Sequence, residues 1–484
     1  MTKNILNVMR PPTLQYFYLE RPMLLLIAIC TISVLLWIGS GDFHTKGEQR
    51  EASVAVSMIE KNQWILPEAH TDELAYKPPL MHWAIALFSL PAGEVTPFTS
   101  RLPSAICFVC LICFSFIFFG KNLRFQDAFL AALIMISCFE LHRAGMTARA
   151  DMMLTFFMVL GLQRLFRWEE RKSLNGLPLV IPIILGLAAL TKGPVGIILP
   201  LLVFGIYLLI LKYNIGKIIL KLLPIALLAL ILPSIWYILA YQVGGKDFLD
   251  LVWAENFGCF LGSENLNIQY NLRHEEPFWY NFATLITGFF HGFFPWTLLL
   301  FMSLFGLNYK VKKKSGKNLW QRISGMEKIK LFSLVAAVVI VLFYCIPSSK
   351  HSVYLMPAYP FIAIFIAEYV LYLTEYKVKI SRFFGIFIGI LGAFISLFWI
   401  FMPLIMTIEP ARKTALERLN GLTDWQHLEF PLFILIGLLV FSIIVLVKHL
   451  WKKNHLKVLY ATIGVYLSLL LVLDGIFAFL ASLP

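Results

Sequence analysis

Charged residues are scarce in this sequence. Asp, Glu, Lys and Arg make up 14% of its 484 residues, whereas 59% are hydrophobic and the mean hydropathy is +0.77. A typical soluble domain carries about 25% charged residues. The composition therefore excludes a single water-soluble domain and indicates an integral membrane protein.

Acidic residues are scarcer than basic ones: 28 Asp and Glu stand against 41 Lys and Arg, and the formal net charge is +13. In a membrane protein this excess is first a signal of topology. The basic residues are scattered among apolar segments and form no dense basic face, so nucleic acid is excluded as a partner. The sequence also lacks an internal repeat of fixed period, which argues against a transporter built from inverted repeats.

Cysteine is rare as well, and six of the seven cysteines lie within or at the ends of apolar runs. A disulfide framework is therefore not predicted. The spacing of Cys107, Cys110 and Cys113 resembles an iron–sulfur motif, but the apolar run 102–119 around them favours a role in packing.

Long apolar runs dominate the rest of the chain, and a helix needs roughly 20 residues to cross the hydrocarbon core. We predict an all-α polytopic integral membrane protein with about 13 transmembrane helices and amphipathic periplasmic juxtamembrane helices. Basic residues precede the first run and no cleavage site follows it, which indicates a retained signal anchor with residues 1–21 in the cytoplasm. The runs lie near 22–40, 102–119, 126–141, 151–166, 178–190, 194–211, 218–241, 283–307, 331–346, 353–374, 383–407, 430–447 and 458–482.

Charge decides the topology of the short apolar stretch 79–92, which is bounded by prolines. If it is a surface or re-entrant helix, most Lys and Arg fall in cytoplasmic segments. If it is a span, the basic run 310–317 lies outside, against the positive-inside rule. We therefore predict two long outside loops, 41–101 and 242–282, and the amphipathic start of the first is predicted to lie on the membrane surface as a helix.

Ionisable side chains at the outer edge of a membrane are costly, which makes them candidates for function. On the predicted outer face, carboxylates, cations and a tyrosine occur together. A carboxylate can take a proton from an acceptor hydroxyl, and Lys, Arg or a phenol can neutralise charge on a departing phosphate. The residues are Glu48, Lys77, Arg101, Arg149, Asp151, Lys192, Arg273, His274, Lys350 and Tyr354.

Nine short motifs, in a fixed order over roughly residues 20–375, carry a family resemblance. They are GEQREASVAVSMIEKNQWILP, AYKPPLMHW, SRLPSA, ARADMML, LTKGP, WAENFGCFLG, RHEEPFWY, GFFPW and SSKHSVYLMPAYP. Together they resemble the lipid-carrier-dependent glycosyltransferases of the GT-C fold. The branch they resemble most is the bacterial aminoarabinose transferase of lipid A, a relative of the protein O-mannosyltransferases.

The resemblance implies an inverting transferase that moves a sugar from a polyprenyl-phosphate donor, on the periplasmic face of the bacterial inner membrane, with no nucleotide sugar. Its acceptor would be lipid A, another glycolipid or a protein, and the enzyme would act as a monomer among membrane lipids. No cofactor is required by this reading, although a divalent metal, Zn or Mg, is an alternative that the family raises.

The catalytic carboxylate departs from the family pattern. The family begins its first loop with Asp-Glu, and the Asp is the usual candidate for the base, but here the pair reads Gly47-Glu48. Glu48 or Asp151 is therefore predicted to be catalytic, and loss of activity is the third alternative. Without the resemblance, Asp151 would be a first-turn acid favoured by the helix dipole, and Glu48 a solvated helix residue.

Five residues are predicted to bind the donor phosphate. Lys77 matches the family's Lys-Pro-Pro, and Tyr354 matches a tyrosine that hydrogen-bonds the phosphate. The basic Lys350, Arg273 and Lys192 have suitable chemistry, Arg in a bidentate manner. The structural alternatives are snorkelling for the lysines and an aromatic-belt position for the tyrosine.

His274 matches a family histidine that binds substrate or metal, but Tyr76 stands where relatives often carry a glutamate of that metal site. The basic residue that the family places after its histidine is also missing here, since Glu275 and Glu276 follow. We predict a catalytic transmembrane module over 22–375 and C-terminal transmembrane helices without a large soluble domain over 376–484. The competing functional class is a transporter or flippase of a lipid-linked saccharide.

Overall fold

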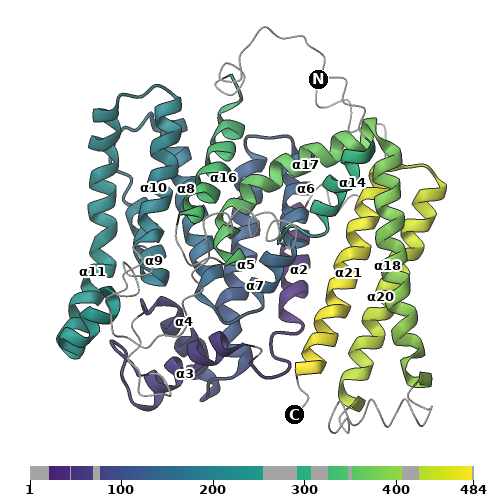
Figure 1. Cartoon of the computed structure of the whole chain (residues 1–484), viewed down its shortest axis with the longest axis horizontal. Coiled ribbons are helices and arrows are strands. Elements are labelled where there is room, and N and C mark those ends of the chain that lie inside the picture. Colours follow the sequence, from purple (N-terminus) through teal and green to yellow (C-terminus); the bar gives the residue numbers. More distant parts are fainter. Residues whose placement is uncertain are drawn as a thin grey trace.

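The chain folds into helices that run mostly along one common direction (Figure 1). This computed structural model describes residues 21–43, 45–68, 77–253, 292–306, 325–346, 351–405 and 425–481. Within these ranges there are α-helices and short 3-10 helices and no β-strand. The prediction of an all-α fold is confirmed.

Several of the helices are long and apolar enough to cross a membrane: seven in the described residues, or up to eight if a bent pair counts as one span. The bent pair is α6 (Phe125–Ile136) and α7 (Phe139–Gly145), whose axes differ by 63°. The chain is therefore a multi-pass membrane protein. The total of about 13 spans stays a prediction, because run 283–307, for example, reaches beyond the described ranges. The seven candidate spans are Pro97–Gly120, Ile215–Trp253, Lys328–Cys345, Ser352–Tyr376, Val378–Phe401, Leu432–Trp451 and His455–Ile476.

A central group of helices holds most of the buried apolar side chains. In it α8 packs against α5 and α9, and α9 packs against α10 and α11. Two further helices, α16 and α17, close the group, with the short 3-10 helix η3 between them in the chain. Their bounds are α5 (Pro97–Gly120), α8 (Ala150–Lys172), α9 (Val180–Lys192), α10 (Val195–Ile210), α11 (Ile215–Trp253), α16 (Lys328–Cys345), η3 (Ser352–Ala358) and α17 (Tyr359–Tyr376).

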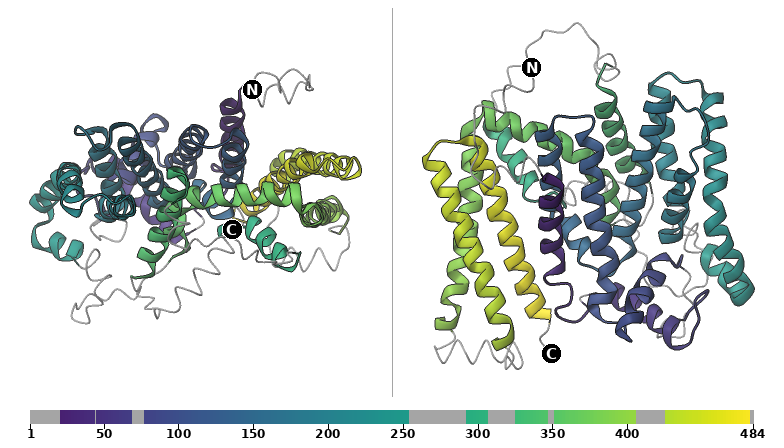
Figure 2. Two further views of the ribbon diagram at one scale, coloured as in Figure 1. Left: turned by 90° about the horizontal axis from the view of Figure 1, so that it is seen from above. Right: turned by 180° about the vertical axis from the view of Figure 1, so that it is seen from behind.

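The C-terminal helices α18 (Val378–Ile405), α20 (Trp425–Trp451) and α21 (His455–Ala481) pack on one another at one side of the molecule (Figure 2). Helices α2 (Pro22–Leu35) and α14 (Trp296–Gly306) lie next to this group. Three polar contacts of the described residues join it to the rest: the Trp37 indole donates to the carbonyl of Leu471 at 3.0 Å, the Tyr466 hydroxyl donates to the carbonyl of Phe294 at 3.3 Å, and His142 pairs with Asp474 at 2.6 Å. Polar pairs of this kind in an apolar setting fix how helices meet.

The first predicted loop forms two helices at one end of the bundle, α3 (Lys46–Glu60) and α4 (Leu80–Ser89) (Figure 1). A ten-residue helix rises only about 15 Å, and α4 with the following η1 (Leu90–Ala92) is shorter than the candidate spans, as are α2, α9 and α10, which lie in runs predicted to span. Thr45 caps α3 by accepting from the amide of Glu48 at 3.2 Å. The amphipathic helix exists where it was predicted, but it packs against α4 and buries two glutamates as well as its apolar face.

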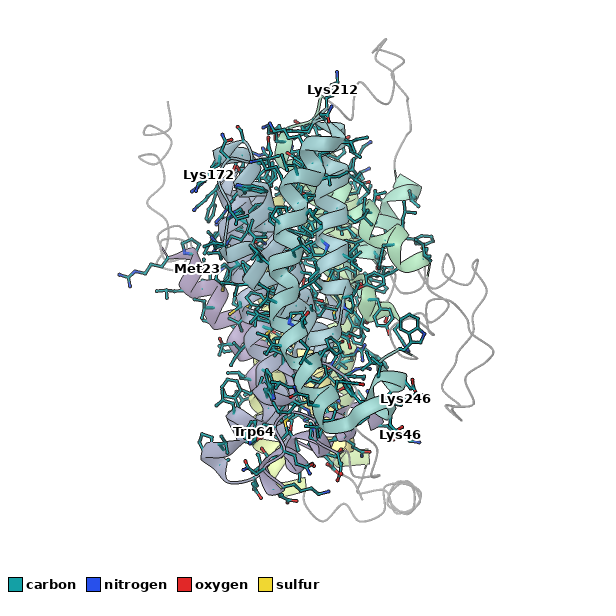
Figure 3. The ribbon with its side chains drawn as sticks, turned by 90° about the vertical axis from the view of Figure 1, so that its left-hand side faces the viewer. Met23, Lys46, Trp64, Lys172, Lys212 and Lys246 are labelled. Atoms are coloured by element: carbon teal, nitrogen blue, oxygen red, sulfur yellow. The ribbon has the colours of Figure 1, made fainter. Side chains whose placement is uncertain are left out.

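The two ends of the bundle carry different loops (Figure 3). Lys172 and Lys212 lie at one end, while Lys46, Trp64 and Lys246 lie at the other. The predicted topology places the first pair on the cytoplasmic face and the other three outside. The structure therefore separates these residues as the topology requires.

Six of the seven cysteines lie in the described ranges, and all six are free. Cys107, Cys110 and Cys113 lie on α5, a helix that packs against several neighbours. The described residues contain no group of three His, Cys, Asp or Glu that could hold a metal ion. The packing interpretation of the three-cysteine motif therefore agrees with its place in the fold.

Candidate active site

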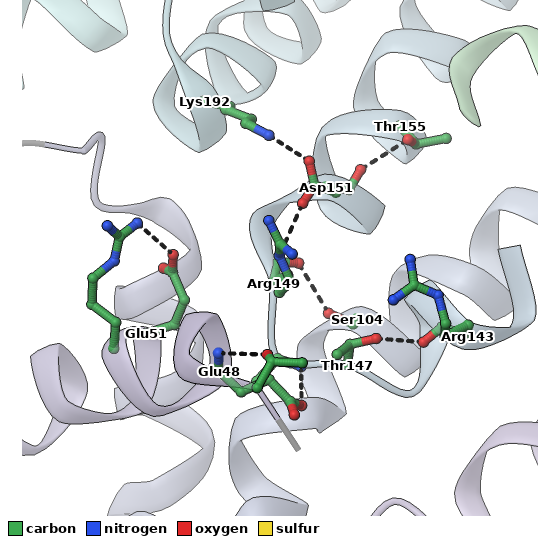
Figure 4. A network of polar contacts seen from close by, with 12 residues as sticks. Glu48, Glu51, Ser104, Arg143, Thr147, Arg149, Asp151, Thr155 and Lys192 are labelled. Carbon is green, nitrogen blue, oxygen red and sulfur yellow. Dashed lines mark hydrogen bonds and ion pairs between the residues drawn. The ribbon is translucent and has the colours of Figure 1, made fainter. Parts of the chain in front are cut away.

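Asp151 is the centre of a first cluster, at the end of the bundle that carries α3. It lies in the first turn of α8 and is buried, and its carboxylate forms ion pairs with Lys192 and, at 3.3 Å, with Arg149 (Figure 4). The N-cap position itself belongs to Arg149, and no side chain caps the helix. The Asp151 carboxylate therefore binds two cations and caps no helix. The Thr155 hydroxyl donates to the backbone carbonyl of Asp151 at 2.8 Å, so it does not contact the carboxylate.

Lys192 reaches this cluster because α9 ends at the right place. Gly193 follows it with a φ of 89°, a conformation that glycine adopts readily, and Pro194 starts the next helix. The ammonium lies 4.4 Å from the ring centre of Tyr354, which is within cation–π range. The structure thus brings together three predicted site residues, Asp151, Lys192 and Tyr354, from three separate elements.

The charge balance of this Asp151 cluster favours an anion. The carboxylate is 6% exposed, whereas the side chains of Arg149 and Lys192 are 39% and 27% exposed. One buried negative charge therefore faces two cations that still reach the surface, so the cluster keeps a net positive charge. Arg and Lys at such a surface are the groups that bind phosphate oxygens.

Glu51 is the centre of a second cluster. It lies on α3, is buried, and pairs through Oε2 with Nε2 of His82 at 2.6 Å. Its other oxygen, Oε1, lies 3.4 Å from Nζ of Lys77 and 3.7 Å from a guanidinium nitrogen of Arg50. Lys77 and Arg50 are 35% and 34% exposed, so this Glu51 cluster also presents cations at the surface.

Electrostatics link the two clusters. Burial raises the pKa of the Glu51 carboxyl. The charge and hydrogen bond of His82 and the charge of Arg50 lower this pKa by more than burial raises it, so it lies below its usual value. The negative charge of Asp151 acts on Glu51 in the raising direction. The charge of Asp151 therefore reaches Glu51, which places the two clusters near one another.

Glu48 is placed differently. It is fully buried, and its Oε1 accepts from Nε of Arg101 at 3.0 Å and from the amide of Ala148 at 2.9 Å. Arg101 is buried too and also donates to the carbonyls of the chain before α3, at Ile38 and Asp42. Glu48 thus ties α3 to α5 and to the loop before α8.

Gly47 stands where the resemblance predicts a carboxylate. A Cβ added there would lie 3.8 Å from the guanidinium of Arg149 and 3.7 Å from the Thr45 hydroxyl. These are ordinary van der Waals distances, so a Cβ fits at this position and would lie beside Arg149 of the Asp151 cluster.

The other predicted residues fall outside the described ranges. Lys350, Arg273 and His274 are among them, as is Tyr76 at the expected metal position. Whether the chain binds a metal ion at His274 therefore stays a prediction. Sequence reasoning missed Glu51 and His82, although Glu51 stands one helical turn after Gly47 and His82 follows the Lys-Pro-Pro motif closely.

The chain is similar to known proteins over much of its length. The family model described as dolichyl-phosphate-mannose-protein mannosyltransferase matches residues 76–237. An undecaprenyl phosphate-alpha-4-amino-4-deoxy-L-arabinose arabinosyl transferase of Pectobacterium carotovorum is 26% identical over 345 residues, 69% of this chain and 55% of that protein. The Shewanella sediminis transferase of the same description is 23% identical over 351 residues, 71% of this chain and 59% of that protein. The chain thus spans less than two thirds of the length of these relatives.

Among solved structures, ArnT from Cupriavidus metallidurans bound to undecaprenyl phosphate superposes with a TM-score of 0.65. The match covers 94% of this chain and 77% of ArnT at 18% identity. At this identity the likeness shows the fold. The resemblance to the GT-C lipid-carrier-dependent glycosyltransferases, predicted from nine ordered motifs, is confirmed by the family match and the shared fold.

Proposed function

We propose that this chain is an inverting glycosyltransferase that moves a sugar from a polyprenyl-phosphate donor to an acceptor on the periplasmic face of the bacterial inner membrane. The observation that carries the proposal is the meeting of Asp151, Lys192 and Tyr354 with Arg149, next to the Glu51 cluster with Lys77. The likeness to transferases that use an undecaprenyl-phosphate sugar supports the carrier lipid. The acceptor is lipid A, another glycolipid or a protein.

The chemistry of such a transfer matches the charges present. The acceptor oxygen attacks the anomeric carbon on one face while the bond to the phosphate oxygen breaks on the other. The electron pair of that bond leaves with the phosphate, so negative charge develops there. Lys77, Lys192 and Arg149 are cations with exposed ends that can stabilise this charge, and the Tyr354 hydroxyl can donate to a phosphate oxygen.

The roles of the two predicted carboxylates follow from their partners. Asp151 holds Lys192 and Arg149 in place for the phosphate, with one carboxylate oxygen on each cation. Glu48 anchors α3, because Arg101 and the Ala148 amide already occupy it away from solvent. Lys350 and Arg273 are proposed as further phosphate ligands and His274 as a substrate or metal ligand, on the sequence motifs alone.

The test uses purified full-length protein in lipid nanodiscs with a panel of undecaprenyl-phosphate sugars and a glycolipid extract as acceptor. We expect sugar transfer, or release of undecaprenyl phosphate by hydrolysis, with at least one donor. Lys77→Ala should weaken undecaprenyl phosphate binding about 10- to 100-fold, as for the loss of a charge-assisted hydrogen bond. Lys61→Ala is the matched control, because Lys61 lies just beyond α3 and pairs with the exposed Glu68.

The proposal fails if no donor is transferred or hydrolysed and Lys77→Ala leaves carrier binding unchanged. Translocation of the carrier across vesicles without transfer would support the transporter class in its place. Mass spectrometry of lipid A, glycolipids and glycoproteins from cells with and without the gene would identify the acceptor.

A further inference from the structure

The missing carboxylate at Gly47 leaves the proposed reaction without the family's candidate for the base. The helix offers a replacement one turn later, because residues four apart lie on the same face of an α-helix. Glu51 occupies that position on α3. It is buried, and it faces Lys77, the proposed phosphate ligand, at 3.4 Å.

The oxygens of the three buried carboxylates at this end differ in how tightly they are held. Asp151 has one cation on each oxygen, and Glu48 accepts two good hydrogen bonds on Oε1. Glu51 Oε2 is held by His82 at 2.6 Å, but the cations nearest Oε1 lie at 3.4 and 3.7 Å, at or beyond the limit of a hydrogen bond. Oε1 of Glu51 is therefore a carboxylate oxygen whose neighbours hold it loosely.

We infer that Glu51 is the catalytic base of this chain and that it takes over the task of the carboxylate that Gly47 lacks. This inference rests on the proposed function. In the transfer, the O–H bond of the acceptor breaks and its proton passes to Oε1 of Glu51. The acceptor oxygen forms the bond to the anomeric carbon, and the electron pair of the broken C–O bond leaves with the phosphate. The proton later returns to solvent, so no further reactant is required.

Lys77 connects donor binding with proton transfer from the acceptor. In the structure it lies near Oε1 of Glu51 with 35% of its side chain exposed. When a donor phosphate attracts the ammonium, Lys77 moves away from Oε1, and the oxygen is left to accept from the acceptor. Donor binding thereby prepares the base.

His82 is the positioning residue of this base. It is 3% exposed on α4, and its Nε2 lies on Oε2, so it sets the plane of the carboxylate and directs Oε1 toward Lys77. Its Nδ1 is buried and has no hydrogen-bond partner among the described residues. A buried polar atom without a partner is costly, so His82 is held in this place by its contact with Glu51 at the expense of its other nitrogen.

The experiment compares Glu51→Gln with the wild type in the nanodisc assay described above. Glutamine keeps the shape and a partner for His82 but cannot accept the proton. We expect transfer to fall about 10²- to 10⁴-fold, the usual contribution of a general base, while undecaprenyl phosphate binding stays near wild type and the variant remains folded, with a somewhat lower Tm. Glu60→Gln is the matched control, because Glu60 is exposed at the end of the same helix.

Rescue separates a catalytic role from a structural one. Gly47→Asp should restore transfer at least tenfold in the Glu51→Gln background, because a Cβ fits at position 47 and would lie beside Arg149. His82→Gln, which retains a donor near Oε2, should lose less transfer than His82→Leu. Should Glu51→Gln fold poorly, Glu51→Asp takes its place: we expect it to keep part of the transfer with normal carrier binding.

Three outcomes overturn the inference. If Glu51→Gln transfers sugar within about threefold of the wild-type rate, Glu51 is not the catalytic base. Equal losses of transfer and carrier binding would make Glu51 a mere holder of Lys77. No gain from Gly47→Asp would show that a carboxylate at position 47 cannot do the work of Glu51, and would remove the claim that Glu51 takes over that task. In all three cases the wild type is active, whereas an inactive wild type refutes the proposed function itself.

Discussion

Glu48 and Glu51 lie one turn apart on α3 and both are buried, yet their surroundings differ. Arg101, the partner of Glu48, is itself buried, and its remaining donors go to backbone carbonyls. Of the partners of Glu51, Lys77 and Arg50 are about one third exposed. The comparison teaches that burial of a carboxylate does not identify its role. What matters is whether its partners can turn toward a ligand.

The largest expected effect concerns the buried Glu48–Arg101 pair. Glu48→Ala would leave the guanidinium without its counter-charge and the Ala148 amide without an acceptor, which typically costs about 3–5 kcal/mol of folding stability. We expect a clearly lower Tm of the purified protein in detergent. Glu60→Ala on the same helix should leave the Tm unchanged. A Glu48→Ala protein with normal Tm and no transfer would instead indicate that Glu48 is catalytic. The two glutamates would then no longer differ in role.

A middle-sized effect concerns the cation that Asp151 holds. Lys192→Ala removes a charge-assisted contact to the proposed donor phosphate, worth about 1.5–3 kcal/mol, so undecaprenyl phosphate should bind about 10- to 100-fold more weakly. Tyr354 and Arg149 would remain. Lys212→Ala, at the opposite end of the bundle (Figure 3), is the control. Unchanged carrier binding in Lys192→Ala would reduce the Asp151 cluster to a structural ion pair.

The smallest effect is a pH dependence that sharpens the view of Glu51. Its pKa is lowered in the fold by His82 and Arg50 against the effect of burial. The ionised carboxylate therefore stabilises the folded protein above its unfolded pKa of about 4.3, and this contribution is lost as the pH falls through the lower folded value. We expect the Tm difference between wild type and Glu51→Gln to be steady near neutral pH and to shrink below about pH 4. A difference that grows on acidification would contradict the assigned direction.

Much of the fold was predictable, because membrane insertion leaves a strong mark on composition. Apolar runs predicted the helical class, and charge favoured a 79–92 segment that does not span, where α4 is only ten residues long. The amphipathic start of the first loop predicted α3. Its burial of Glu48 and Glu51 was not predictable, because helical periodicity identifies an apolar face but not the charged partners that other elements bring to a polar one.

The site was predictable only in part. Asp151, Lys192 and Tyr354 stood out as ionisable or phenolic groups at helix ends, and they do meet. Glu51 and His82 are 31 positions apart in the chain, and nothing in either motif says that they touch. Their pairing depends on how α3 packs against α4.

The sequence by itself determined that this is a polytopic helical membrane protein, which end of each helix carries which charges, and that a family carboxylate is replaced by Gly47. These features are local, since hydropathy and charge act residue by residue along the chain. The tertiary structure alone decided which carboxylates are held by buried partners and which have partners that can turn toward a ligand. Ion pairs join side chains from separate helices, and a charge in a low-dielectric interior is governed by the few partners that packing places within about 4 Å.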